Sequence, residues 1–417
     1  MLFQLATLLT IAAASNCVNE GGNWYCDQTS QITFSGLGGT PGSYDRVSNM
    51  DPETCTCSKT PQPFSGPLSP LDEDLSLHFR GPIAIKQFAA YTLQSLPQSK
   101  KKRGKRTIKD RFVDLFRREQ VVYTLIPPIS SRYAASTPVA VAYPTETPVA
   151  VVPTPAPSAP TTTAAAIVPP VSTPTQVGTS SSWQRSSYYN AQSATLQNAV
   201  FMNNMGGVNG SGTWSPCFGN SVSFASASGM GSAPNPEVLQ DITLPSNTEV
   251  ILFSGEQCTT ATCGYVAPGV PAYRGFSGQN KIFLFEFSMP LDGDRGFNGD
   301  MPAIWALNGQ IPRSQQYGGC SCWQTGCGEL DLFETLSAGS ERMIATFHSR
   351  PGQGGSTPNW IQRPTGGSMK AAVVFLGGSK TIKLIHLADS VNFEGGLSQS
   401  LVDSWDLSGA TAVSLVA

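Results

Sequence analysis

One short segment of the sequence places three carboxylates among apolar residues. Residues 328–335 read Gly-Glu-Leu-Asp-Leu-Phe-Glu-Thr, and the acidic side chains are Glu329, Asp331 and Glu334. Cleavage of a glycosidic bond with retention needs two carboxyl groups about 5–5.5 Å apart, one as nucleophile and one as proton donor. Neighbouring carboxylates repel each other, which raises the pKa of at least one and keeps it protonated. The segment predicts a glycosidase site. The alternatives are a solvated acidic strand or a Ca²⁺ site, although Ca²⁺ sites prefer loops of Asp, Asn and Gly.

The spacing of the two glutamates requires an irregular strand. In a regular strand, side chains alternate between faces, so Glu329 and Asp331 share one face and Glu334 lies on the other. A single bulged residue at Leu332 or Phe333 returns Glu334 to the face of Glu329, and bulges re-aim side chains next to active sites. With the bulge the two glutamate Cα atoms lie about 13 Å apart, at about 3.3 Å per step. Their long side chains can then lean together across this gap.

Three other side chains are candidates for substrate binding. Trp305 lies in the apolar run 302–307, and Trp323 stands shortly before the acidic segment. An indole ring stacks on the apolar face of a pyranose, and the alternative for each Trp is packing in the core. His348 ends the alternating run 343–348. We consider it as a donor to a sugar hydroxyl or to the carboxylates, with a purely structural histidine as the alternative.

These candidates lie in a part of the chain that is rich in predicted strands. Apolar or alternating runs recur between turn residues at 249–253, 281–289, 302–307, 329–336, 343–348, 371–376 and 381–387. The run 281–287 is apolar on both faces, as the central strand of a two-layer sandwich is. No GxGxxG or GxxxxGK[ST] loop stands between a strand and a helix, which argues against a nucleotide-binding fold. Residues 183–417 therefore predict one large β-sandwich domain.

Composition and turn residues divide the whole chain into four parts. Gly and Pro number 41 and 32 of 417 residues, which excludes a coiled coil and argues against a mostly helical protein. The N-terminal segment is short and apolar and ends in small residues, as a secretory signal does. The parts are a signal peptide at 1–15, a Cys-containing β-rich module at 16–96, a linker at 97–182 and the β-sandwich domain at 183–417.

The linker combines a basic run with Pro-rich sequence. Residues 100–120 hold ten Lys or Arg against three Asp or Glu, and the dibasic pair at 105–106 is a candidate cleavage site for a processing protease. Between positions 127 and 174 lie 12 of the 32 prolines. Proline removes backbone donors, and the surrounding small residues have little to bury. We expect an extended, O-glycosylated stalk.

The ten cysteines divide into four before the linker and six after it. In an exported protein, an even number in each part allows each part to close its own disulfides, and the pairing stays open. Cys320, Cys322 and Cys327 lie close together as zinc ligands do, but export and the lack of nearby His favour disulfides. The N-glycosylation sequon that begins at Asn209 is consistent with export.

Charge and hydropathy limit the partners of the chain. The net charge is −2, and outside the basic run the chain is acidic, so nothing in the charge favours nucleic acid. No apolar run of 18 or more residues follows the N-terminal segment, so we expect no membrane-spanning helix. We expect a secreted monomer that uses no cofactor and no metal and acts on a neutral polysaccharide.

Together these motifs resemble a known enzyme family. Glu329-Leu-Asp-Leu-Phe-Glu334 is similar to the ExDxxE signature of family 16 glycoside hydrolases in its bulged, laminarinase-type form. Residues 301–308, Met-Pro-Ala-Ile-Trp-Ala-Leu-Asn, resemble the PAxWxL strand of that family, and Trp323 precedes the acidic segment much as an active-site Trp does there. The order of the parts resembles the fungal target-of-SBF type cell-wall proteins. The insert at 310–326, which contains two cysteines, departs from the laminarinase pattern.

This resemblance implies an all-β protein whose C-terminal domain is a jelly-roll β-sandwich with a concave cleft. It implies that Glu329 is the nucleophile, Glu334 the acid/base and Asp331 the assisting carboxylate. It favours sugar stacking for Trp305 and Trp323, and it implies retaining endo-hydrolysis of β-1,3-glucan in the fungal cell wall. Two alternatives stay open, namely a glucan transglycosylase that uses the same glutamates and a non-catalytic glucan-binding wall protein.

Overall fold

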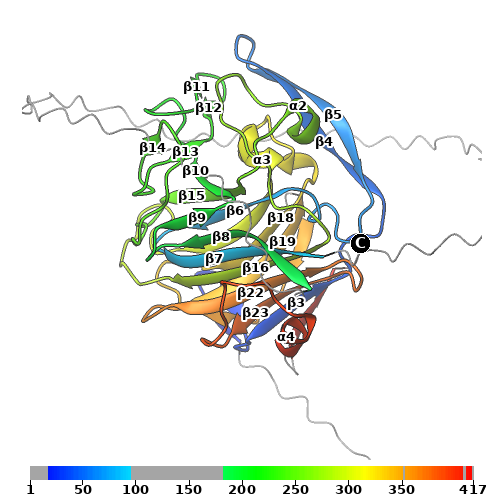
Figure 1. The fold of residues 1–417 in the computed structure, drawn as a ribbon, viewed down its shortest axis with the longest axis vertical. Helices are drawn as coiled ribbons and strands as arrows, with labels where there is room; N and C mark the ends of the chain where they lie inside the picture. The colour runs from blue at the N-terminus through cyan, green and yellow to red at the C-terminus, as the bar shows by residue number, and fades with distance from the viewer. Residues whose placement is uncertain (1–16, 95–181, 351–352, 407–409, 416–417) are drawn as a thin grey trace, which may run out of the picture. The chain divides into compact units, whose positions relative to one another are not determined.

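The computed structural model describes residues 17–94, 182–350, 353–406 and 410–415. The expected signal peptide and almost all of the expected linker, with its dibasic pair, lie outside these residues. The described chain is all-β with a few short helices, as the sequence predicts, and two large sheets form its body (Figure 1). All seven apolar or alternating runs in the C-terminal part correspond to strands.

The candidate acidic segment is an inner strand of the first large sheet. Among the described residues this sheet has ten strands, in the order β14 (Ser232–Ala233), β13 (Ser223–Ala225), β10 (Ala199–Asn203), β15 (Glu249–Ser254), β6 (Leu75–Arg80), β17 (Ala303–Asn308), β18 (Glu329–Glu334), β19 (Arg342–Arg350) and β20 (Gln353–Ser356), with β21 (Ile361–Gln362) also paired to β19. The pairs β15–β6, β6–β17, β17–β18 and β18–β19 are all antiparallel.

The second large sheet packs against the first. Its eight described strands follow the order β24 (Thr411–Ser414), β3 (Gln31–Ser35), β23 (Thr381–Leu387), β22 (Met369–Leu376), β16 (Asn280–Ser288), β7 (Ala84–Leu93), β8 (Trp183–Asn190) and β9 (Thr195–Gln197). The ring centroids of Phe79 on β6 and Phe285 on β16 lie 6.2 Å apart, and those of Phe333 on β18 and Phe287 on β16 lie 5.4 Å apart. These contacts join the inner faces of a two-layer sandwich, and each buried Phe stabilises it by about 1.5–3 kcal/mol.

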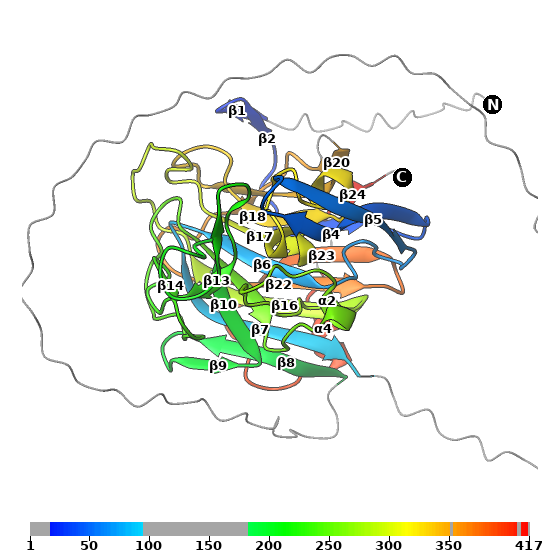
Figure 2. The ribbon, with the colours of Figure 1, turned by 90° about the horizontal axis from the view of Figure 1, so that it is seen from above.

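The remaining elements are short or lie outside the two sheets. Three two-stranded sheets are β1 (Val18–Glu20) with β2 (Asn23–Tyr25), β4 (Gly42–Asp51) with β5 (Thr56–Phe64), and β11 (Trp214–Ser215) with β12 (Gly219–Asn220). The described helices are α2 (Thr260–Cys263), α3 (Gln310–Arg313), the 3₁₀ helix η1 (Trp323–Thr325) and α4 (Gln399–Ser404). Figure 2 shows the hairpins β1–β2 and β4–β5 on the side of β17 and β18. Within the described ranges, no helix combines the length and the apolar character that crossing a membrane requires.

The N-terminal strands are built into both large sheets. Strand β6 lies between β15 and β17, and β7 lies between β16 and β8. Leu77 and Phe79 of β6 are fully buried in the shared core, where strands from the C-terminal part surround them. The expectation that residues 16–96 form a module of their own is therefore wrong, because these strands find their partners and their core in residues 182–415.

The disulfides likewise join the two parts of the chain. The bonds are Cys17–Cys26, Cys55–Cys217, Cys57–Cys320, Cys258–Cys263 and Cys322–Cys327. Two of them tie the hairpin β4–β5 to residues beyond the linker, so the two parts do not each close their own disulfides. An even count in each part does not reveal this, because two bonds between the parts leave both counts even. The cysteines with zinc-like spacing are all in disulfides, as expected.

Candidate active site

The site begins with a bulge in β18. Phe333 pairs with Ile304 on β17, and the next pair in register joins Asp331 to Trp305, so Leu332 has no partner across this ladder. Leu332 and Phe333 are both buried in the core between the sheets. This is the bulge that the acidic spacing predicts, and it accommodates two consecutive apolar side chains on the inner face.

The bulge brings all three carboxylates to the outer face of the ten-stranded sheet. Their directly opposed partners on β17 are Ala303 for Glu334, Trp305 for Asp331 and Leu307 for Glu329. These three partners belong to one apolar cluster that is separate from the core between the sheets. Because directly opposed residues of paired strands share a face, Glu329, Asp331 and Glu334 also share one.

Glu329 is held by two donors from the loop that precedes β18. The hydroxyl of Tyr317 donates to Oε1 at 2.8 Å, and Nε1 of Trp323 donates to Oε2 at 2.5 Å. The Glu329 residue is only 7% exposed. Because each carboxylate oxygen has its own donor, the group is fixed in a single orientation, as a nucleophile that attacks along one direction needs to be.

Asp331 and His348 form the centre of the carboxylate row. Nε2 of His348 lies 3.0 Å from Oδ2 of Asp331. Burial, together with the charge of Glu334, raises the pKa of Asp331 to about 8. The hydrogen bond to Asp331 raises the pKa of His348. The pair therefore retains a proton to higher pH than either group would alone.

Glu334 lies beside a cation from the N-terminal part of the chain. Nη2 of Arg80 on β6 donates to Oε1 of Glu334 at 3.3 Å, and Nε of Arg80 donates to the carbonyl of Met301. The pKa of Glu334 is raised because burial outweighs the opposing effect of Arg80. A carboxyl whose pKa is raised keeps its proton to higher pH than an ordinary glutamate does, which suits a proton donor.

Trp305 lies in the site but is largely covered. Its ring stacks on His78 of β6 with the centroids 5.0 Å apart, and its Nε1 donates to the Tyr317 hydroxyl at 3.1 Å. Only 5% of Trp305 is exposed, so the environment of this ring is mostly protein. Trp323 is half-buried and packs edge-on against Tyr317 at 5.3 Å. Of the two indoles expected to stack on sugar, Trp323 is the more open.

The structure adds residues that the sequence analysis did not identify. His78 is completely buried beneath Trp305, and its two ring nitrogens lie 2.9 Å from Ser76 Oγ and 2.7 Å from Glu249 Oε1. Ser76, His78 and Arg80 alternate with apolar residues along β6, a pattern that assigns them to one face of the strand. That pattern was visible in the sequence, but the pairing of β6 with β17 was not.

Tyr317 was missed for a different reason. It lies in the insert at 310–326, which has no hydrophobic period, and its φ of 56° places it in a left-handed turn. The bonds Cys57–Cys320 and Cys322–Cys327 hold the loop that carries it. Across the described ranges, His, Cys, Asp and Glu side chains nowhere gather in threes as a metal site would require.

Comparison with known proteins points to a single family. Residues 181–405 match the family model described as "Cell wall protein YJL171C/Tos1, C-terminal", and residues 30–93 match the one described as "Cell wall protein YJL171C/Tos1, N-terminal". No solved structure matches the chain.

Relatives from three fungi are similar over nearly the full length. A Saccharomyces cerevisiae protein named "Probable circularly permuted 1,3-beta-glucanase TOS1" is 40% identical over 95% of this chain and 94% of its own. A Candida albicans protein of the same name is 37% identical over 97% of both chains. An Arthroderma benhamiae protein named "Probable circularly permuted 1,3-beta-glucanase" is 32% identical over 90% of this chain and 89% of its own.

Proposed function

Because this chain belongs to the Tos1/YJL171C family of cell wall proteins, we propose that it is a β-1,3-glucanase that cleaves wall glucan with retention. The names of its relatives support the substrate. The bulge in β18 carries the proposal, because it puts Glu334 on the same face as Glu329. The inclusion of β6 and β7 in sheets formed mainly by the C-terminal part fits the circular permutation in the names of the relatives.

In the first step Glu329 is the nucleophile. Tyr317 and Trp323 orient its carboxylate toward the anomeric carbon, and a glycosyl–enzyme ester forms as the glycosidic C–O bond breaks. Glu334 gives its proton to the departing oxygen, which leaves as a sugar hydroxyl. The raised pKa of Glu334 keeps this proton available.

In the second step Glu334 acts as a base. It takes a proton from a water molecule, the water attacks the anomeric carbon, and the bond to Glu329 breaks. Asp331, which shares a proton with His348, lies between the two glutamates along β18 and limits the negative charge on this face. Trp323 and His348 are the partly exposed side chains that we assign to sugar contact, and Trp323 packs against the apolar cluster that contains Trp305.

The test is the release of reducing ends from a linear β-1,3-glucan by the full disulfide-bonded chain. We expect the wild type to release oligosaccharides. NMR spectra recorded early in the reaction should show the β anomer at their newly formed reducing ends. Glu329→Gln should abolish release, and Glu334→Gln should slow it by about 10²–10⁴-fold. Glu286→Gln, on the eight-stranded sheet, is the matched control and should retain full activity.

Four outcomes would contradict parts of this proposal. Full activity of Glu329→Gln would exclude this nucleophile, and an α product would exclude retention. Longer products in the presence of an added oligosaccharide acceptor would identify a transglycosylase that uses the same glutamates. Binding of glucan without cleavage by the wild type would favour a non-catalytic wall protein.

A further inference from the structure

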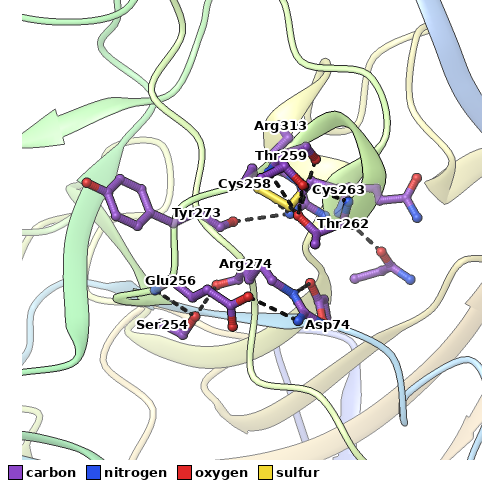
Figure 3. The surroundings of a disulfide bond; sticks show 12 residues. Asp74, Ser254, Glu256, Cys258, Thr259, Thr262, Cys263, Tyr273, Arg274 and Arg313 are labelled. Atoms are coloured by element: carbon purple, nitrogen blue, oxygen red, sulfur yellow. Dashed lines mark hydrogen bonds and ion pairs between the residues drawn. A yellow bond between two sulfur atoms is a disulfide. The ribbon is translucent and has the colours of Figure 1, made fainter.

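A hollow of about 280 Å³ lies beside the Cys258–Cys263 disulfide, and Glu329, Asp331 and Glu334 are not among the residues that line it. Its walls come from the hairpin β4–β5, the chain just before β6, helix α2, helix α3 and the segment around Arg274. Figure 3 shows Arg274, Asp74 and Arg313 around this disulfide. Three arginines line the hollow, namely Arg46, Arg274 and Arg313, and we call it the arginine hollow.

Arg313 is a buried cation whose donors are incompletely satisfied. It is 5% exposed, and its Nη1 donates to the carbonyl of Tyr273 at 3.1 Å and contacts Sγ of Cys258. Its Nε–H has no acceptor, and within the described ranges no carboxylate forms an ion pair with it. Burial accordingly lowers the pKa of Arg313 to about 10. A buried guanidinium with an unused donor is costly unless a ligand supplies the acceptor.

The acidic groups of the hollow are already engaged. Both carboxylate oxygens of Asp74 accept from Arg274, at 2.9 and 3.2 Å. Oε2 of Glu73 accepts from Tyr44 at 2.7 Å and from Asn308 at 2.8 Å. Burial raises the pKa of Glu73.

Arg46 is the second cation without a partner. Its guanidinium lines the hollow from β4, and among the described residues no hydrogen bond or ion pair holds it. The groups that remain to be satisfied are thus cationic donors on two different elements, Arg46 on β4 and Arg313 on α3. A ligand that satisfies both must offer several acceptors and a negative charge.

We propose that the arginine hollow binds a small oxyanion, a phosphate or carboxylate group, between Arg46 and Arg313. Planar guanidinium groups match the geometry of oxyanions and bind them by charge-assisted hydrogen bonds. A neutral sugar fits less well, because the single aromatic residue of the lining, Tyr44, is 1% exposed and offers no ring face for stacking. The oxyanion is either a free ion or part of a larger molecule.

Such a ligand connects two elements that the polypeptide places far apart in sequence. It joins β4 to α3, and Tyr44 on β4 packs in the same apolar cluster as Trp305 and Leu307, the strand partners of Asp331 and Glu329. Binding should therefore stabilise the fold and slow amide exchange in the hairpin β4–β5, independently of any glucan cleavage.

The experiment titrates the full disulfide-bonded chain with inorganic phosphate, glucuronate or glucose at constant ionic strength held by NaCl. Unfolding temperature and titration calorimetry are measured. We expect saturable stabilisation by phosphate, by glucuronate or by both, which also identifies the preferred oxyanion, and none by glucose. Arg46→Gln and Arg313→Gln should each weaken binding by at least about tenfold, as the loss of a charge-assisted hydrogen bond implies. Arg185→Gln on β8 is the control and should bind like the wild type.

Arg46 is only half-buried, so we expect Arg46→Gln to fold. This variant keeps the test decisive if Arg313→Gln does not fold. Two results with the wild type would overturn the proposal, namely no stabilisation by either oxyanion beyond that of chloride, or saturable binding of glucose. Wild-type affinity in Arg46→Gln would also overturn it, because the oxyanion would then lie elsewhere on the chain.

Discussion

The hydroxyl of Tyr317 donates to Oε1 of Glu329 at 2.8 Å and accepts from Trp305 Nε1 at 3.1 Å. One phenol therefore connects the proposed nucleophile to the indole of Trp305. Burial and the neighbouring Glu329 charge raise the pKa of Tyr317 well above its usual value, so the hydroxyl stays protonated and remains a donor. This makes Tyr317 a positioning residue for Glu329.

We predict that Tyr317→Phe lowers kcat for glucan cleavage by about 10–100-fold, since a hydrogen bond to a charged group contributes about 1.5–3 kcal/mol. KM should change little, because the hydroxyl acts through Glu329. Initial rates over a range of glucan concentrations separate kcat from KM. Tyr265→Phe, in a different loop, is the control. An unchanged kcat would assign Tyr317 to packing alone.

Arg80 gives a second prediction that concerns the proton donor. Because Arg80 favours the ionised form of Glu334 and lowers its pKa, Arg80→Gln should raise that pKa further. Glu334 must be protonated to act as an acid, so the basic limb of the activity profile should move to higher pH. Arg80→Lys keeps the positive charge and should keep the limb near its original position. If the basic limb stays in place in Arg80→Gln, Glu334 is not the group that titrates there.

The local features of the site could be predicted from the sequence. Three acids within six residues of an otherwise apolar strand can be distributed over the two faces of the strand in only a few ways. The bulge at Leu332 and Phe333 follows from the need to bury both of these side chains. The strand runs of the C-terminal part were also visible, because apolar alternation is a property of each segment by itself.

The non-local features could not be predicted in this way. The insertion of β6 between β15 and β17 depends on which strand edge is free in the folded chain, and no pattern within residues 75–80 encodes this. Trp305 has the same local pattern whether its ring meets sugar or His78. The bonds from Cys55 and Cys57 to the C-terminal part follow from the position of the hairpin β4–β5, which is itself set by tertiary packing.

The buried Asp331 carboxyl beside His348 gives a prediction about stability. Folding raises the pKa of Asp331 from 3.8 to about 8, so the folded state binds this proton more tightly than the unfolded state does. That contribution is fully present below about pH 3.8 and is lost as the pH rises toward about 8. The unfolding temperature of Asp331→Asn relative to the wild type should therefore increase across this range.

Asp406 is a control of opposite sign for the same measurement. Its hydrogen bond from Lys383 lowers its pKa, so its contribution to stability is present at higher pH and is lost as the solution becomes acidic. Relative to the wild type, Asp406→Asn should become less stable as the pH rises from strong acid toward the ordinary Asp pKa, and the difference should stay constant at higher pH. A pH-independent difference for Asp331→Asn would mean that this carboxyl has the same pKa in the folded and unfolded states.

The Cys57–Cys320 bond should be important for both stability and activity. It ties the hairpin β4–β5 to the loop of Tyr317 across a sequence separation of 263, whereas Cys258–Cys263 spans only 5. A disulfide that closes a longer loop restricts the unfolded chain more. The free energy of unfolding should therefore fall by about 2–5 kcal/mol in the double variant Cys57→Ser/Cys320→Ser, and by less in Cys258→Ser/Cys263→Ser. The first variant should also lower kcat, since the donor to Glu329 is less firmly held. Denaturant unfolding and glucan cleavage by the two variants check both effects, and equal activity in the two would show that this tether does not position Tyr317.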